Sequence, residues 1–193
     1  MATDRIMATI STALTTWEEF VELPDPEDGS RYELHDGEVV VVPPVKPIHL
    51  NIQSLLTEWL LAEARGRGRA FSEYGYRPTP DLQYWYADIA FVPKEDWERI
   101  LRSNEYRVYA PPLVVEVLSP SNRRKRVQRQ RITAFSAGTR EFWIIDPTRR
   151  TIEVSVPGAT SRIYTIDEEV PVTVLPGSRL PVRILFAPDL PTT

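Results

Sequence analysis

The chain has 193 residues, of which 42% are hydrophobic and 26% are charged, and its formal net charge is −4. This composition is typical of a soluble globular domain that is long enough to bury a core. It excludes disulfides and thiolate metal sites, because there is no cysteine, and it excludes binding of nucleic acid over a uniformly basic surface.

The N-terminal residues contain no apolar segment of the kind found in signal peptides, and no part of the chain approaches the ~20 apolar residues of a membrane span. We therefore expect a cytoplasmic protein without a membrane partner. Residues 1–14 are predicted to be a flexible leader, and residues 15–193 are predicted to form one domain.

The first half of the chain alternates short strands and helices. A short helix is expected around Trp17, capped by Thr15 or Thr16. The Asp36-Gly37 dipeptide predicts a hairpin between strands at 32–34 and 38–42. Apolar residues at helical spacing then predict a helix over residues 48–63.

The second half is richer in strands. Two strands are predicted over 70–77 and 84–92, a short helix over 94–102, a strand over 113–118, a basic helix, a strand over 141–145 and an antiparallel pair over 151–156 and 162–166. The tail from Val170 onward is rich in proline and is predicted to be irregular. This order of elements indicates an α/β domain with a mixed sheet flanked by helices.

Three carboxylates, Glu33, Asp88 and Glu116, lie inside otherwise apolar predicted strands. A charge in such a strand is costly unless it is paired or binds a cation. If the strands are neighbours, the three side chains could converge on one divalent cation, and oxygen ligands suit Mg²⁺ or Mn²⁺. The alternative is that each carboxylate pairs separately with an arginine, and the sequence leaves both readings open.

The segment over residues 122–131 is strongly basic and contains no acid; its cations are Arg123, Arg124, Lys125, Arg126, Arg129 and Arg131. A solvated helix face is the simplest explanation. A phosphate-binding surface is the functional one, because the segment follows Glu116 closely and the rest of the chain is acidic. Asn122 is the expected helix cap.

The remaining polar and aromatic residues give weaker signals. His49 is predicted to be a capping or structural residue at the start of the 48–63 helix, and His35 is predicted to be exposed. The aromatic residues Tyr84, Trp85 and Tyr86 are expected in the core and at its rim rather than as base-stacking residues.

Five segments, in this order, resemble a known family: YELHDGEVV (32–40), PPVKPIHLNI (43–52), ADIAFV (87–92), PPLVVEVLSPS (111–121) and GTREFWIIDP (138–147). The chain is similar to the Uma-type, restriction-endonuclease-like bacterial proteins of the PD-(D/E)XK nuclease superfamily. Each motif is modest alone, but the five together, from about Trp17 to the tail, are specific at the level of the family.

The resemblance implies a restriction-endonuclease-like fold and metal-assisted hydrolysis of phosphodiester bonds by a Mg²⁺- or Mn²⁺-dependent endonuclease. It implies that Asp88 and Glu116 are catalytic metal ligands and that Glu33 supports them. The substrate would be DNA or RNA, with DNA favoured. Its backbone would be held by the basic helix, through Arg123, Arg124, Lys125, Arg126 and Arg129. A homodimer is an expectation by analogy, because cutting two strands needs two sites.

The chain departs from the family where the resemblance calls for a catalytic lysine. Gln130 stands at that position and Arg126 stands where an aspartate is usual. Gln130 can donate a hydrogen bond to water or phosphate but carries no charge, and Arg126 is a poor proton acceptor. The sequence therefore supports two alternatives to an active nuclease: a catalytically impaired nuclease-like protein that binds nucleic acid or a protein partner, and a purely structural domain.

Overall fold

The structure, a computed structural model, describes residues 14–103, 110–119 and 124–186, and within the last range it describes side chains from residue 126 onward. The predicted leader, except for Leu14, lies outside the described residues. So do Asn122, the expected cap of the basic helix, and Arg123.

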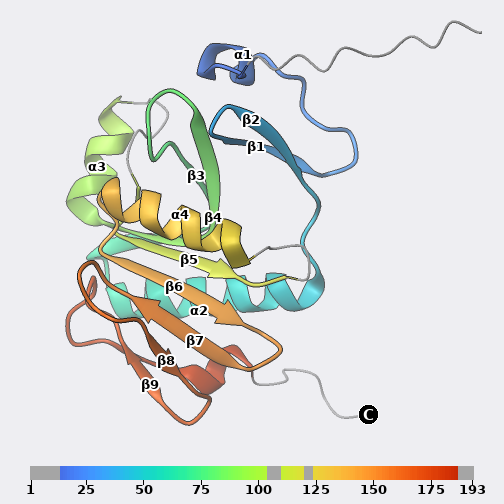
Figure 1. The fold of residues 1–193 in the computed structure, drawn as a ribbon. Helices are drawn as coiled ribbons and strands as arrows, with labels where there is room; N and C mark the ends of the chain where they lie inside the picture. Colours follow the sequence, from blue (N-terminus) through green and yellow to red (C-terminus); the bar gives the residue numbers. More distant parts are fainter. Residues whose placement is uncertain (1–13, 104–109, 120–123, 187–193) are drawn as a thin grey trace, which may run out of the picture.

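The described residues form a mixed sheet in the order β2-β1-β4-β5-β6-β7-β8, with β3 paired to β4 off this path (Figure 1). Only β5 and β6 pair in parallel, and the other neighbours in the sheet are antiparallel. The strands are β1 (Arg31–His35), β2 (Glu38–Val42), β3 (Gly68–Tyr76), β4 (Gln83–Pro93), β5 (Leu113–Val117), β6 (Glu141–Asp146), β7 (Thr151–Ser155) and β8 (Arg162–Tyr164).

Helices cover both faces of the sheet; they are α1 (Trp17–Val21), α2 (Pro47–Ala64), α3 (Lys94–Ser103) and α4 (Arg124–Ser136). Figure 1 shows α2 behind the central strands and α4 in front of them. The predicted α/β architecture with a flanked mixed sheet is therefore confirmed. Among the described helices, none is both long and apolar enough to cross a bilayer.

The hydrophobic core has two halves, one on each face of the sheet. On the α2 side, β5 contributes Val115 and Val117, and on the α4 side it contributes Val114. A parallel strand pair that is covered on both faces reads as a continuous apolar run. Glu116 shares the α4 face with Val114 by alternation, so it is the one polar interruption in a strand that is buried throughout.

The predicted hairpin is confirmed by its turn geometry. Asp36 and Gly37 both have positive φ, 51° and 80°. Two-residue turns that match the twist of antiparallel strands need positive φ at both central positions, and Asp-Gly is a preferred pair there. This turn sets the register in which Glu33 lies opposite Val40.

The prediction of an irregular tail was wrong. Residues Glu169–Pro171 (β9) and Arg179–Pro181 (β10) form a two-stranded ribbon, and a 3-10 helix, η1, follows over Val182–Leu185. The apolar side chains of these elements and of the segment between β9 and β10 complete the core on the α2 side; they include Val170, Val172, Leu175, Leu180, Val182 and Leu185. The strands are only three residues long, and their prolines lie at strand ends where a missing N–H is tolerated.

Candidate functional site

A cavity of about 650 Å³ opens between the β1–β2 hairpin, strands β4 and β5, and the first turns of α2 and α4. All three carboxylates that the sequence singled out line it, together with His49 and Gln130. The cavity wall also carries three described cations and an apolar rim; these residues are Arg31, Lys46, Arg126, Val41, Val42, Pro43, Pro44, Val45, Ile48, Leu118 and Val127.

Asp88, on β4, lies at the centre of a row of acidic side chains. The β4–β5 register pairs Ile89 with Val115, so one step further along brings Asp88 opposite Glu116. The Asp88 carboxylate takes the place of a backbone acceptor between β4 and β5, because its Oδ2 accepts a hydrogen bond of 2.6 Å from the Val117 amide. The side chain is consequently buried and fixed between two strands.

A backbone kink in β3 places a fourth carboxylate on the other side of Asp88. The β3–β4 register pairs Ser72 with Ile89 and Tyr74 with Ala87, which leaves Glu73 and Asp88 facing each other between these pairs. The φ of Glu73 is 52°, a left-handed conformation that non-glycine residues rarely adopt. Regular alternation would put Ile89 and Ala87 on one face, yet Ile89 packs in the α2 core and Ala87 in the α4 core. Strain of this kind costs about 1–3 kcal/mol and gathers at functional sites.

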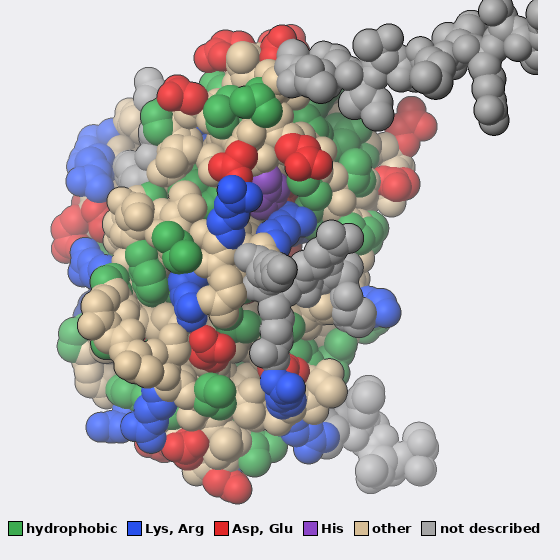
Figure 2. Space-filling model, viewed as in Figure 1, with side chains coloured by type: hydrophobic (Ala, Val, Ile, Leu, Met, Phe, Trp, Pro, Cys, Tyr) green, Lys and Arg blue, Asp and Glu red, His purple; other side chains and the backbone are tan. Residues whose placement is uncertain are grey.

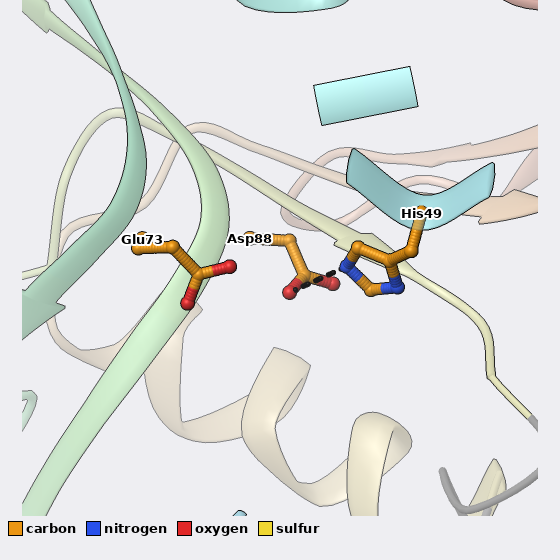
Figure 3. A group of neighbouring side chains, drawn as sticks. All are labelled: His49, Glu73 and Asp88. Atoms are coloured by element: carbon orange, nitrogen blue, oxygen red, sulfur yellow. Dashed lines mark ion pairs between the residues drawn. The ribbon is translucent and has the colours of Figure 1, made fainter. Parts of the chain in front are cut away.

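Glu73 and Asp88 form a close group with His49, from the first turn of α2, and the three side chains point toward one another (Figure 3). One ligand atom from each lies within 4.8 Å of the others. His49 Nε2 is 3.0 Å from Asp88 Oδ1, but without the alignment of a hydrogen bond, so this buried nitrogen has no hydrogen-bond partner among the described residues. Lone-pair donors in such an arrangement are suited to a metal ion.

The sequence did not single out Glu73, and it took His49 for a capping or structural residue. Glu73 does lie inside a predicted strand. However, Ser72 and Tyr74 beside it give the polar and apolar alternation of a half-exposed strand, in which a glutamate is not unusual. Gln53 Nε2 contacts the Glu73 carboxylate and lies 3.2 Å from the Asp88 carbonyl oxygen. Burial raises the pKa of Glu73, and Arg31 and Gln53 oppose that rise.

Glu116 is buried on the side of Asp88 opposite to Glu73, in surroundings that disfavour an ionised carboxylate. Burial raises the pKa of Glu116 well above its usual value, and the charges of Asp88 and Glu33 raise it further, against the opposing charges of Arg126 and Arg31. A carboxyl group in this position favours a proton or a cation beside it. The pKa of Tyr76 is also raised well above its usual value, by burial and then by Glu116 and Glu33.

Glu33 lines the same cavity but has the partners that the arginine-pairing alternative predicted. Its carboxylate contacts Arg126, lies 2.8 Å from His35 Nε2 and lies 3.7 Å from Arg31. Burial would raise the pKa of Glu33, but the His35 hydrogen bond and the charges of His35, Arg126 and Arg31 outweigh it and leave the pKa lowered.

The prediction that His35 is exposed was wrong. Its side chain is only 15% exposed, because the end of β1 packs between α4 and β4. The ring stacks on Trp85 with centroids 5.5 Å apart, and Nε2 lies 2.7 Å from an Arg126 nitrogen. The expectation that Trp85 belongs to the core is confirmed.

The comparisons with known proteins agree with this geometry. The sequence model of the Uma2 family, described as "Putative restriction endonuclease", matches residues 17–183. The chain belongs to this family. Among solved structures the chain is similar to "a putative nuclease belonging to DUF820 from Anabaena variabilis", with 25% sequence identity and a TM-score of 0.74, over 88% of this chain and 96% of that one. A comparison with curated proteins finds no match.

Family membership and the solved relative confirm the resemblance and the restriction-endonuclease-like fold, and both support a nuclease. One residue of α4 departs from what the resemblance implies. Gln130, at the position where the resemblance calls for lysine, is buried and lines the cavity. The amide can donate to an oxygen in the cavity, but it brings no positive charge.

The described cations of α4 are engaged with acids from distant parts of the chain. Arg126 contacts Glu33, Arg129 lies 3.2 Å from Asp36, and Arg131 lies 2.9 Å from Glu153. The side chains of Arg124 and Lys125, like the whole of Arg123, are outside the described part. Figure 2 shows basic and acidic side chains intermixed over the face on which α4 lies.

The residues present fit a divalent cation. Asp88 is flanked by Glu73 and Glu116, and the buried His49 nitrogen lacks a hydrogen-bond partner among the described residues. Carboxylate oxygens alone suit Mg²⁺, whereas an added imidazole favours Mn²⁺ and other transition metals. The identity of the ion thus depends on whether His49 takes part.

Proposed function

We propose that this chain is a metal-dependent endonuclease that hydrolyses phosphodiester bonds in DNA. The observation that supports the proposal is the acidic row of Glu73, Asp88 and Glu116 across three adjacent strands, beside His49. Asp88, Glu116 and His49 line a cavity that also carries cations. Family membership supports the same reaction class. Buried acids gathered beside cationic groups serve phosphate chemistry better than they serve stability.

Asp88 is the central metal ligand, because it lies between Glu73 on one side and Glu116 on the other. Glu116 completes the set predicted from the sequence, and His49 and Glu73 are the donors that lie closest to Asp88 on the other side. A bound Mg²⁺ or Mn²⁺ supplies an activated water and offsets charge on the phosphate. The Val117 amide keeps the Asp88 carboxylate oriented, since it donates to Oδ2.

The residues around this row have supporting roles. Glu33, held by Arg126 and His35, maintains the wall of the cavity and orients water. Gln130 donates a hydrogen bond to water or to a phosphate oxygen in place of the usual lysine. Arg126 brings a planar guanidinium, which suits phosphate geometry, to the lining of the same cavity.

The test is cleavage of supercoiled plasmid and of single-stranded DNA by purified protein with Mg²⁺ or Mn²⁺, next to the variants Glu116→Ala and Asp88→Asn. We expect nicking by the wild type that EDTA removes and that both substitutions abolish. The exposed pair Lys94 and Glu98 on α3 provides a matched control, because Glu98→Ala removes an acid far from the cavity. Cleavage that survives Glu116→Ala would exclude the proposed ligand set.

A catalytically impaired nuclease-like protein that binds nucleic acid is the second candidate, and Gln130 is the observation that favours it. The variant Gln130→Lys separates the two. If the wild type is inert and Gln130→Lys gains metal-dependent cutting, the native chain is a disabled nuclease. If neither protein cuts but the wild type retards DNA in a gel, the binding function stands. Gel filtration of the DNA complex tests the expected homodimer.

A further inference from the structure

The positive charges that line the cavity are unequally engaged. Arg31 contacts Glu73 and lies 3.7 Å from Glu33, and Arg126 contacts Glu33 as well. Lys46 is the third lining cation. Among the residues that the structure describes, it has no carboxylate within ion-pair distance, so its charge remains available to a ligand.

Lys46 is also held in place by its backbone. It is the N-cap of α2, and its carbonyl oxygen accepts hydrogen bonds from the amides of His49 (2.9 Å) and Leu50 (3.1 Å). Pro44 and Pro47 stiffen the chain on either side. A fixed backbone lowers the entropy cost of using the side chain for binding, because only the rotatable bonds of the lysine need to be ordered.

The dipole of α2 favours negative charge beside Lys46. The helix has 18 residues, no acid in its first turn and no side chain that caps it. The N-terminus of a helix carries partial positive charge, and no negative group of the helix competes for it. In the same turn the amides of His49 and Leu50 donate to the Lys46 carbonyl oxygen, and His49 Nε2 lies 3.0 Å from Asp88 Oδ1. The Lys46 ammonium is therefore the group of this turn that is placed to contact a phosphate.

From these observations we propose that Lys46, at the start of α2, forms the phosphate-binding subsite of the cavity. The ligand is a backbone phosphate of the nucleic-acid strand. Lys46 lines the same cavity as Asp88, Glu116 and Gln130, so it supplies the positive charge that Gln130 lacks. The inference rests on the proposed function and names the residue that positions its substrate.

The test is binding, so that it does not depend on catalysis. Fluorescence anisotropy of a short fluorescein-labelled DNA duplex is measured in EDTA, between about 50 and 200 mM KCl, for the wild type, Lys46→Ala, Lys46→Arg and Lys94→Ala. Lys94 is the matched control, since it is an exposed lysine that pairs with Glu98 at 3.8 Å on α3. A single phosphate contact contributes about 0.9 to the slope of log K against log salt concentration.

We expect Lys46→Ala to weaken binding about three- to tenfold and to make the salt slope shallower by roughly one unit, whereas Lys46→Arg and Lys94→Ala retain the wild-type slope. A slope and affinity of Lys46→Ala equal to those of the wild type overturn the inference, as does a wild type that binds no duplex. Plasmid cleavage separates the two proposals. If Lys46→Ala cuts as well as the wild type, the nuclease function stands and the phosphate-binding subsite is excluded. If DNA binding depends on Lys46 but the wild type does not cut, the subsite stands and the nuclease function is excluded.

Discussion

The first turns of α2 and α4 border the same cavity and use positive charge in different ways. In α4 basic residues are dense, but Arg126, Arg129 and Arg131 each have an acidic partner. In α2 the cavity-lining basic residue is Lys46, and it has no acidic partner among the described residues. The number of cations in a segment therefore says less about anion binding than whether those cations are already paired.

The pairing has a structural reason. Arg126 and Arg129 meet Glu33 and Asp36 of the β1–β2 hairpin, which lies about ninety residues earlier in the chain. These contacts fasten the hairpin over α4 and close one wall of the cavity. The α2 turn closes the other wall through proline and backbone hydrogen bonds, so its cation is not needed for the fold. One helix contributes to architecture, and the other is free to contribute to binding.

The largest effect is expected for the acidic row between the two helices. Glu116→Gln should reduce metal-dependent cleavage by about a thousandfold, because a ligand that offsets several kcal/mol of charge is lost. The same change should raise the stability of the metal-free protein by about 1 kcal/mol, since it removes a buried carboxyl group beside Asp88. Plasmid nicking and urea denaturation in EDTA measure the two effects.

Opposite signs in these two measurements would identify Glu116 as a residue kept for function. Glu153→Gln is a control, because Glu153, on β7, pairs with Arg131 of α4 and does not line this cavity. It should leave cleavage unchanged. Loss of both activity and stability in Glu116→Gln would instead indicate a structural role.

A second prediction concerns the metal donor in the first turn of α2. His49→Ala should lower Mn²⁺ affinity about tenfold or more and affect Mg²⁺ less, because an imidazole ligand favours transition metals. Isothermal titration calorimetry with each ion measures this. Leu50→Ala is the matched control, as Leu50 lies in the same turn and is exposed. Equal losses for both ions would show that His49 acts on the fold of the site and not as a ligand.

Much of the fold could be predicted because local signals were strong. The spacing of Ile52, Leu56 and Leu60 predicted α2, and all three are buried. The Asp36-Gly37 turn predicted the hairpin. The tail could not be predicted in this way, because three-residue strands with prolines give no periodicity. Their stability comes from packing under α2, a tertiary effect that local sequence does not record.

The site could be predicted only in part. Asp88 and Glu116 stand among apolar residues in buried strands, so their charge was conspicuous, and both line the cavity. Glu73 was missed because its contribution depends on a kink, and His35 was misjudged because it is covered by α4. The ion pairs of Arg126 and Arg129 join residues that are far apart in the sequence, and no pattern in the helix indicates them.

A third prediction measures the architectural role of α4. Arg126→Ala should destabilise the fold by about 2 kcal/mol, because it leaves the buried Glu33 carboxylate with fewer partners. Arg129→Ala should cost less than about 0.5 kcal/mol, since both Arg129 and Asp36 are exposed and the pair is screened by solvent. Urea denaturation at low salt gives both values. Similar losses for the two arginines would mean that burial of Glu33 does not make its ion pair stronger than the surface pair.

The smallest expected effect is the pH dependence of stability that comes from the contact between Glu33 and Arg126. Because His35, Arg126 and Arg31 lower the pKa of Glu33 against the effect of burial, the folded state binds this proton less readily than the unfolded state does. Glu33 therefore stabilises the fold above the unfolded pKa of about 4.5, and this stabilisation is lost as pH falls through the lower pKa of the folded state.

Glu33→Gln should flatten that part of the pH profile, so that the midpoint of thermal unfolding falls less steeply below about pH 4.5 than in the wild type. Lys46→Ala should leave the profile unchanged, because Lys46 has no carboxylate partner among the described residues. A profile that is equally steep in Glu33→Gln would mean that other carboxylates, such as Glu168 with its lowered pKa from the Thr165 and Arg162 hydrogen bonds, dominate the acid response. The hairpin would then be held to α4 by packing rather than by charge, and the contrast between the two helices would rest on Lys46 alone.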